Sequence, residues 1–326
     1  MIQFSFLPVA GRSTAPDGAS ETPRRLIPHI EPLATQRPVN LVRQATPLGG
    51  LRYAQASFWE ERCLGVVNRT TIDKTITLHW HLQPNAQAVL TYEAASPVLQ
   101  KPNLTALEKA LLLLATLYQR LEADTTAAGQ LLILRNHAEI LHTWTAVQEE
   151  LIRRSGGEDE VTQILLKAVS AQLQQPEAIL ASLCHDYSFA FLLPDLYHQR
   201  FESSFSYEQA REFPLFFTNT SLCFWEHLVV MAPVAAGRAR LRVSGSLDAT
   251  RTNMAAVAQQ VDAAFAAANL PAHTTSPATL HGTYEAVFDL DLVTGWPITV
   301  EASVVCRAGD SYSKEYYLRF EQLPTP

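Results

Sequence analysis

The chain has 326 residues, of which 47% are hydrophobic and 17% charged, and its formal net charge is −7. This composition excludes a disordered protein, and the acidic balance argues against a nucleic-acid-binding protein, which usually carries a basic domain or face. No run reaches the roughly 18 apolar residues of a membrane span, and the first residues lack the charged start and long apolar region of a secretory signal. We therefore expect a cytoplasmic protein without a membrane span.

Residues 1–40 begin with an apolar run, Ile2 to Val9, and continue into a stretch rich in Pro, Ser, Thr and Arg. The prolines forbid a regular helix in this stretch. We predict an extended, Pro-rich N-terminal arm that, where ordered, lies across another surface of this chain or of a partner.

Residues 41–100 are predicted to form an antiparallel β region. Its clearest strand alternates apolar with polar side chains, which is the period-two pattern of a strand with one buried face. The apolar set is Ile76, Leu78, Trp80 and Leu82, and the polar set is Thr75, Thr77, His79 and His81.

Residues 101–200 are predicted to be a helical block. Thr105 and Glu108 have the spacing of a capping box, and apolar residues then recur at helical intervals through Leu121. A second helix is expected to begin at Asn136, a third to include Val161 to Leu173, and a fourth to begin at Pro176, where proline is favoured. Leu131 to Leu134 fits either a short strand or a buried connector.

Residues 201–326 are predicted to be a β-rich domain of order β-β-α-β-β-β. The strongest pattern is at the C-terminal end, where three segments place their apolar residues at even positions, as in a meander with one buried face. These residues include Tyr284, Phe288, Val300 and Leu318. Leu222 to Met231 is apolar on both faces and is expected to be a central strand.

Together these segments predict an α+β fold, with antiparallel β-sheet regions at both ends flanking a central helical block. Periodicity does not decide whether the two sheet regions belong to one domain or two.

Motifs for nucleotide binding, serine hydrolases and zinc peptidases are absent from the sequence. His79 and His81 point the same way on one predicted strand, as two metal ligands would, but no third ligand is visible nearby. We therefore favour a solvated strand face and expect neither a metal nor a cofactor. The four cysteines, which share apolar surroundings, are expected to be buried thiols: Cys63, Cys184, Cys223 and Cys306.

The candidate binding residues are Arg238, Arg240, Arg242 and Trp296. Three guanidinium groups on one strand face could bind an acidic partner or a phosphate, or protect a surface strand against aggregation; the second interpretation is favoured. Trp296 lies beside the turn Asp291 to Pro297, where it could instead cover the end of the sheet. That Asp-x-x-Thr-Gly-x-Pro turn resembles hairpin turns of uncharacterised β-rich bacterial envelope proteins, but it is too short to imply a function.

Three functions are compatible with the sequence. The first is a non-catalytic protein-binding or assembly component, with a protein partner or a second copy of the chain. The second is a small apolar ligand carrier. The third is an enzyme whose site is assembled from scattered residues, with His79, His81, His185 or His227 as acid–base groups.

Overall fold

The computed structural model describes residues 25–28, 39–84, 87–101, 104–155, 160–194, 196–197, 199–201, 205–218, 220–231 and 237–324. The strands are β1 (Arg25–Pro28), β2 (Val39–Leu41), β3 (Leu51–Cys63), β4 (Val66–Leu82), β5 (Gln87–Ala94), β6 (Val98–Leu99), β7 (Arg120–Thr126), β8 (Leu131–Leu134), β9 (Gln199–Phe201), β10 (Phe205–Phe217), β11 (Thr220–Met231), β12 (Arg238–Leu247), β13 (Leu280–Asp291), β14 (Pro297–Ala308) and β15 (Tyr312–Gln322). The α-helices are α1 (Ala106–Ala115), α2 (His137–Ser155), α3 (Glu160–Leu173), α4 (Pro176–Cys184), α5 (Tyr187–Leu192) and α6 (Met254–Ala267), and the 3₁₀ helices are η1 (Thr116–Tyr118) and η2 (Pro277–Thr279).

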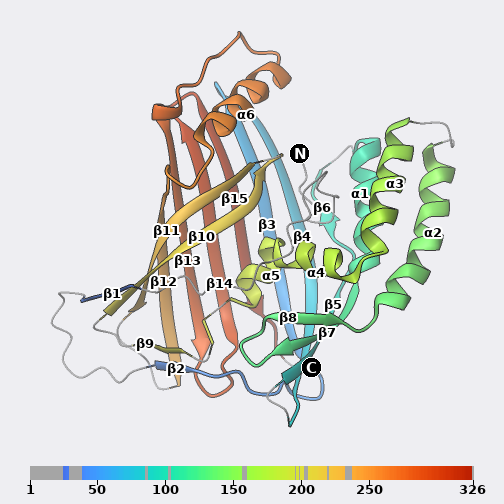
Figure 1. Cartoon of the computed structure of the whole chain (residues 1–326), viewed down its shortest axis with the longest axis vertical. Coiled ribbons are helices and arrows are strands. Elements are labelled where there is room, and N and C mark those ends of the chain that lie inside the picture. The colour runs from blue at the N-terminus through green and yellow to red at the C-terminus, as the bar shows by residue number, and fades with distance from the viewer. Residues whose placement is uncertain are drawn as a thin grey trace.

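One large antiparallel sheet dominates the molecule (Figure 1). Its strands follow the order β1-β10-β11-β12-β13-β14-β15-β3-β4-β5-β7-β8, and β6 pairs with β4 beside this path. The predicted α+β fold, with a central helical block between two sheet regions, is therefore wrong. The reason is the pairing of β15 with β3, which runs from Tyr312 opposite Cys63 to Gln322 opposite Tyr53 and joins the two sheet regions edge to edge.

The C-terminal meander has the predicted alternation. Tyr284, Phe288, Val300 and Leu318 are all buried, and β13, β14 and β15 pair in sequence order. We call the face that carries these side chains the inner face of the sheet and the opposite one the outer face. The inner face continues across β3 and β4 through buried residues such as Tyr53 and Trp80.

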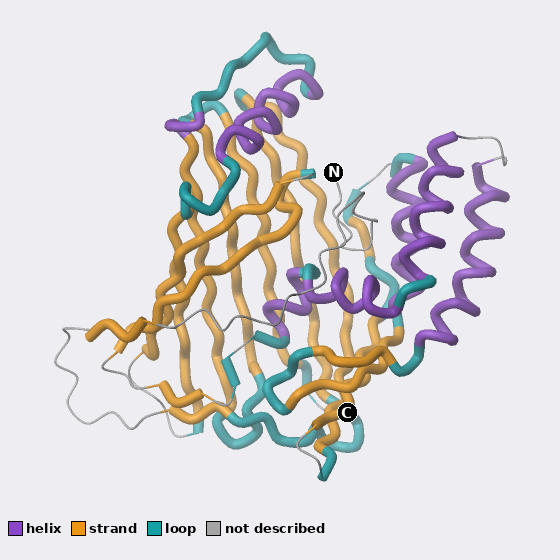
Figure 2. Tube along the Cα trace, viewed as in Figure 1, coloured by secondary structure: helices purple, strands orange, loops and turns teal. Residues whose placement is uncertain are grey.

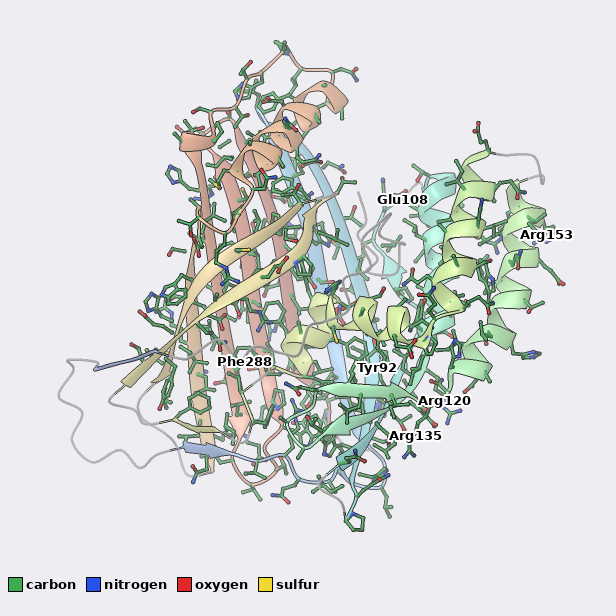
Figure 3. All side chains as sticks on the ribbon, in the orientation of Figure 1. Tyr92, Glu108, Arg120, Arg135, Arg153 and Phe288 are labelled. Atoms are coloured by element: carbon green, nitrogen blue, oxygen red, sulfur yellow. The ribbon has the colours of Figure 1, made fainter. Side chains whose placement is uncertain are left out.

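The inner face is covered by helices and by part of the sheet itself. In Figure 1, α4 and α5 cross in front of the long strands, while β10 and β11 run diagonally over them. The β10–β11 hairpin places the ring centroid of Phe213 4.9 Å from that of Tyr284. It also places the ring centroid of Phe216 5.4 Å from that of Trp59. Tyr92 and Phe288, which are labelled in Figure 3, are both buried. These aromatic contacts close the core between the sheet and its cover.

The helices α1, α2 and α3 stand beside the sheet and α6 lies across one end of its strands (Figure 2). Thr105 and Glu108 form the predicted capping box at the start of α1, and Pro176 lies at the first turn of α4 as predicted. However, the first predicted helix ends before Leu121. Residues from Arg120 onwards form β7, in which Leu121, Ala123 and Thr125 are buried in alternation.

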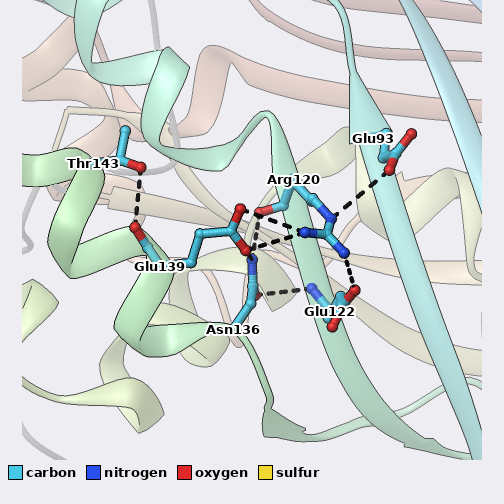
Figure 4. A network of polar contacts seen from close by, with 6 residues as sticks. All are labelled: Glu93, Arg120, Glu122, Asn136, Glu139 and Thr143. Atoms are coloured by element: carbon cyan, nitrogen blue, oxygen red, sulfur yellow. Dashed lines mark hydrogen bonds and ion pairs between the residues drawn. The ribbon is translucent and has the colours of Figure 1, made fainter.

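Hydrogen bonds and ion pairs of polar side chains connect α2 to β7 (Figure 4). The Asn136 amide nitrogen donates to the Arg120 carbonyl at 2.9 Å, and its amide oxygen accepts from the Glu122 backbone nitrogen at 2.9 Å. The Arg120 guanidinium contacts the carboxylates of Glu93, Glu122 and Glu139. The side chain of Asn136 therefore occupies the place of a strand residue beside β7, and the helix begins where that pairing ends.

The chain segment before β3 crosses the end of the sheet. The Gln44 backbone nitrogen donates to the Thr294 carbonyl at 2.9 Å, and the Thr46 nitrogen donates to the Trp80 carbonyl at 3.0 Å. Most of the predicted arm, residues 1–40, lies outside the described residues, apart from β1 and the first two residues of β2.

Candidate functional site

The strongest candidate site is a cavity of about 90 Å³ between the inner face of the sheet and α5. It is lined by β3, β4, β5 and β15, by the segment from Ala94 to Pro97, by the end of α1 and η1, and by residues 185–189. Two of the lining residues, His185 and Ala95, are exposed and mark the side on which the cavity meets solvent. We name it the Lys74 cavity.

The sheet register places polar groups together on the floor of this cavity. Gln55 of β3 lies directly opposite Lys74 of β4, and Ser57 lies opposite Ile72. Because side chains alternate between faces, Gln55, Ser57 and Lys74 all point inward, where most neighbouring positions are apolar. Gln55 and Ser57 are buried, and such polar residues on the buried face of a sheet need partners.

Lys74 supplies the positive charge. Its ammonium donates to the Tyr92 hydroxyl at 3.1 Å, and no described carboxylate lies within ion-pair distance of it. Burial opposes the charged form, but Tyr92 and Asp186 together raise the pKa of Lys74 above its ordinary value. Burial also raises the pKa of Tyr92.

A second polar group surrounds Gln55. Its amide nitrogen donates to Ser188 at 3.1 Å and to Ser57 at 3.4 Å, and the Ser57 hydroxyl donates to the Ile72 carbonyl at 3.4 Å. In this arrangement the Ser57 oxygen accepts from the Gln55 amide nitrogen. The Gln55 oxygen is then buried without a hydrogen-bond partner among the described residues.

Asp186 and His185 line the cavity from the short connection between α4 and α5. Asp186 caps α5, because one of its oxygens accepts from the backbone nitrogens of Ser188 at 2.7 Å and Phe189 at 3.3 Å. Partial desolvation of the imidazole lowers the pKa of His185, against the raising influence of Glu212. Of the histidines named for acid–base chemistry, His185 alone lines this cavity.

The predicted arginine stripe lies on the exposed outer face of β12. Arg240 forms two hydrogen bonds with Asp289, at 2.6 and 2.9 Å, and Arg242 lies 3.5 Å from Glu285. Arg238 makes no ion pair within the described part of the chain. Two of the three charges are therefore already opposed by carboxylates of β13.

Trp296 is 1% exposed and lies at the end of the sheet. Its indole nitrogen donates to the Gln44 carbonyl at 2.9 Å, and its ring packs edge to face against Trp80 at 5.8 Å. It belongs to a cluster separate from the Lys74 cavity, and a ligand does not reach its side chain without rearrangement.

The remaining candidates are dispersed. The rings of His79 and His81 lie 6.5 Å apart on β4, and the Nδ1 atom of His227 lies 2.8 Å from a Glu208 oxygen. All four cysteines are free, but Cys184 is exposed, contrary to the prediction that every thiol is buried. Among the described residues, no group of three or more His, Cys, Asp or Glu side chains is placed to hold a metal ion.

Sequence reasoning named His185 but missed the polar residues on the floor of the Lys74 cavity, Gln55, Ser57 and Lys74. One signal was present: Lys74 interrupts the even-numbered positions of β4, which are otherwise apolar from Ile72 to Trp80. A lysine on that face requires either a partner or a cavity.

Comparison with known proteins gives no assignment: no protein-family model matches the chain, and no curated protein is similar to it. Within the part of the chain that the structure describes, no helix is both long and apolar enough to cross a membrane.

Proposed function

We propose that the protein binds a small polar molecule in the Lys74 cavity. One observation carries this proposal: the cavity is lined by Lys74, whose ammonium makes, among the described residues, a single hydrogen bond, to the Tyr92 hydroxyl, and no ion pair. Buried polar groups without partners are costly, and an ordered water or a bound ion is one explanation for them. Although much of the lining is apolar, the ammonium of Lys74 favours a polar ligand over the small apolar ligand expected for a carrier.

Binding can be tested by thermal unfolding of the full chain with a panel of small polar probes: formate, acetate, urea, acetamide, guanidine and ethanolamine. We expect at least one class of probe to raise the unfolding temperature, because binding to the native state alone stabilises it. Lys74→Met should abolish the shift, whereas Lys167→Met, which removes the same charge from an exposed position of α3, should preserve it. Equal shifts in all three proteins would contradict the proposal.

A protein-binding function has separate support at β8. This strand ends the sheet path, and no described strand pairs with its outer edge. Leu132 is 41% and Ile133 61% exposed. An exposed apolar edge strand is a template for pairing with a strand of another chain, so we propose β8 as the contact with a protein partner or a second copy.

Light scattering after size-exclusion chromatography, together with affinity capture from the native host, tests this second function. We expect a dimer or a captured partner for the natural chain, and loss of either in Ile133→Lys. A strictly monomeric chain that captures no partner would contradict it. The third hypothesis, an enzyme with a scattered site, stays a prediction in which His185 is the histidine that a cavity ligand would reach.

A further inference from the structure

Two opposite charges line the Lys74 cavity without pairing with each other. The Lys74 ammonium has three donors, and one of them is used by the Tyr92 hydroxyl. Asp186 lines the same cavity from the connection between α4 and α5. Burial opposes the charged form of Lys74, but Tyr92 and Asp186 raise its pKa. The carboxylate is therefore close to the ammonium, although no ion pair joins the two side chains among the described residues.

Asp186 has one oxygen available for a ligand. Its Oδ1 accepts from two backbone nitrogens at the start of α5. Its Oδ2 has no hydrogen bond within the described part of the chain and is not fully buried. Burial raises the pKa of Tyr92 and Tyr316, which line the cavity, and the Asp186 carboxylate adds to both shifts. The negative charge of Asp186 therefore acts on the interior of the cavity.

The formal charges of the lining cancel, which restricts the charge of a ligand. Lys74 contributes one positive charge and Asp186 one negative charge, while partial desolvation lowers the pKa of His185 and favours its neutral form. An anion would pair with Lys74 but meet the like charge of Asp186, and a cation would do the reverse. A ligand that carries both charges offers a carboxylate to the ammonium and an ammonium to Oδ2, so both hydrogen bonds are charge-assisted.

The volume of the cavity sets the size of the ligand. An apolar protein cavity of about 150 Å³ holds benzene, which has six non-hydrogen atoms. The Lys74 cavity is smaller, at about 90 Å³, but it meets solvent beside His185 and Ala95. Roughly four or five non-hydrogen atoms therefore fit inside it. An α-amino acid without a large side chain has this size and carries its ammonium one carbon away from its carboxylate.

We infer that the ligand is a small α-amino acid bound as a zwitterion, whose carboxylate accepts from the Lys74 ammonium and whose own ammonium donates to Oδ2 of Asp186. This inference rests on the proposed binding function and specifies its ligand. A ligand of this size reaches about micromolar affinity at best, because the binding energy available per atom is limited.

Calorimetric titration of the full chain with four small probes tests the inference. Glycine carries both charges, and glycolate has a neutral hydroxyl in place of the ammonium. Acetate has the carboxylate alone, and methylamine has the ammonium alone. We expect glycine to bind most tightly and each of the other three to bind about tenfold or more weakly, since a charge-assisted hydrogen bond is lost in every case.

Two variants assign the contacts. Lys74→Met should weaken glycine binding by about tenfold or more. Asp186→Asn keeps a side-chain oxygen that can cap α5, but its amide nitrogen cannot accept from an ammonium. It should reduce the preference for glycine over glycolate to about one.

Matched control variants remove the same charges elsewhere. Lys167→Met on α3 and Asp310→Asn in the turn before β15 change exposed residues, and both should bind the four probes as the natural chain does. Circular dichroism checks that each variant folds.

The possible results separate the two proposals. A preference for glycolate, acetate or methylamine that is lost in Lys74→Met or Asp186→Asn would overturn the amino-acid inference and leave the binding function standing. Glycine binding that is unchanged in both variants would place the ligand outside the cavity and overturn the inference. Absence of binding by all four probes would also overturn it, while a shift with another probe in the thermal-unfolding panel would still support the binding function.

Discussion

The guanidinium of Arg43 occupies the space that a side chain at position 129 would need. A Cβ atom on Gly129 would lie 1.9 Å from Nη1 of Arg43, and that nitrogen donates to the neighbouring Ala128 carbonyl at 3.1 Å. Arg43 is 1% exposed, and its guanidinium carbon lies 3.6 Å from the ring centroid of Tyr197 and 5.2 Å from that of Trp296. The segment before β3 is thus anchored to the β7–β8 turn and to the end of the sheet.

Gly129→Ala should therefore destabilise the protein. The backbone φ of Gly129 is +96°, which is unfavourable for alanine, and the new methyl group would displace a buried cation from its aromatic neighbours. Together these effects should lower the free energy of unfolding by about 2–4 kcal/mol. Denaturant titration measures the loss.

Gly65→Ala is the matched control. Gly65 lies in the β3–β4 turn with a φ of +86°, and no atom of the described residues lies within 4 Å of the position that its new methyl group would take. Only the backbone conformation opposes the change, at about 1 kcal/mol. Equal losses in the two variants would show that Arg43 moves aside freely.

The C-terminal strands could be predicted because their pattern is local. Tyr284, Phe288, Val300 and Leu318 lie on strands that pair with their sequence neighbours, so alternation and turn residues determine the arrangement. The pairing of β15 with β3 could not be predicted in this way. It joins residues far apart in the chain, such as Tyr312 and Cys63, and alternation reports which face of a strand is buried without naming its neighbour.

The short strand β7 and the Lys74 cavity also depend on contacts between distant parts of the chain, which local patterns do not reveal. Leu121 continues the helical spacing of α1, and also begins the alternation Leu121, Ala123, Thr125; tertiary pairing with β5 decides in favour of the strand. Gln55, Lys74 and Asp186 come from separate elements and meet only after the sheet closes under α5. No spacing in the sequence predicts that these three residues lie close together.

Arg240→Ala should have little effect on stability. The Arg240 side chain is 55% exposed, and exposed ion pairs contribute about 0–1 kcal/mol because water and salt screen them. We expect a loss of less than about 1 kcal/mol in denaturant titration, even though the pair with Asp289 has two hydrogen bonds. A larger loss, or one that persists at high salt, would indicate that the arginine stripe supports the fold rather than lying passively on its outer face.

Trp296→Ala, unlike Arg240→Ala, should strongly destabilise the protein. This side chain is buried, and its removal leaves a cavity beside Trp80 and an unpaired Gln44 carbonyl. Replacing a buried tryptophan by alanine costs about 3–5 kcal/mol. If Trp296 acted instead as a ligand-binding residue, the variant would lose ligand affinity with little change in unfolding free energy.

Lys314→Met should stabilise the protein in a pH-dependent way. The ammonium of Lys314 lies over the rings of Phe217, Trp59 and Phe216, at 4.8, 5.5 and 5.9 Å. Burial lowers its pKa, although Glu61 opposes the shift. In the unfolded chain a lysine has a pKa of about 10.4. At pH values between the pKa of Lys314 in the folded protein and about 10.4, the unfolded state therefore binds more protons than the folded state. Stability contributed by this group therefore rises with pH across that interval and is lowest below the folded pKa.

The difference between the variant and the natural chain should follow from that sign. Below the folded pKa of Lys314 the natural chain buries a charge that methionine lacks, so the advantage of Lys314→Met is greatest there. It should shrink as the pH approaches about 10.4, where both states of the natural chain lose the proton. Effects of the buried tyrosines are common to both proteins and cancel in the difference. Denaturant titrations from neutral to alkaline pH measure this, with the exposed Lys167→Met as the control that should show a small, constant difference. An advantage that stayed constant with pH would show that the ammonium of Lys314 remains hydrated in the native state.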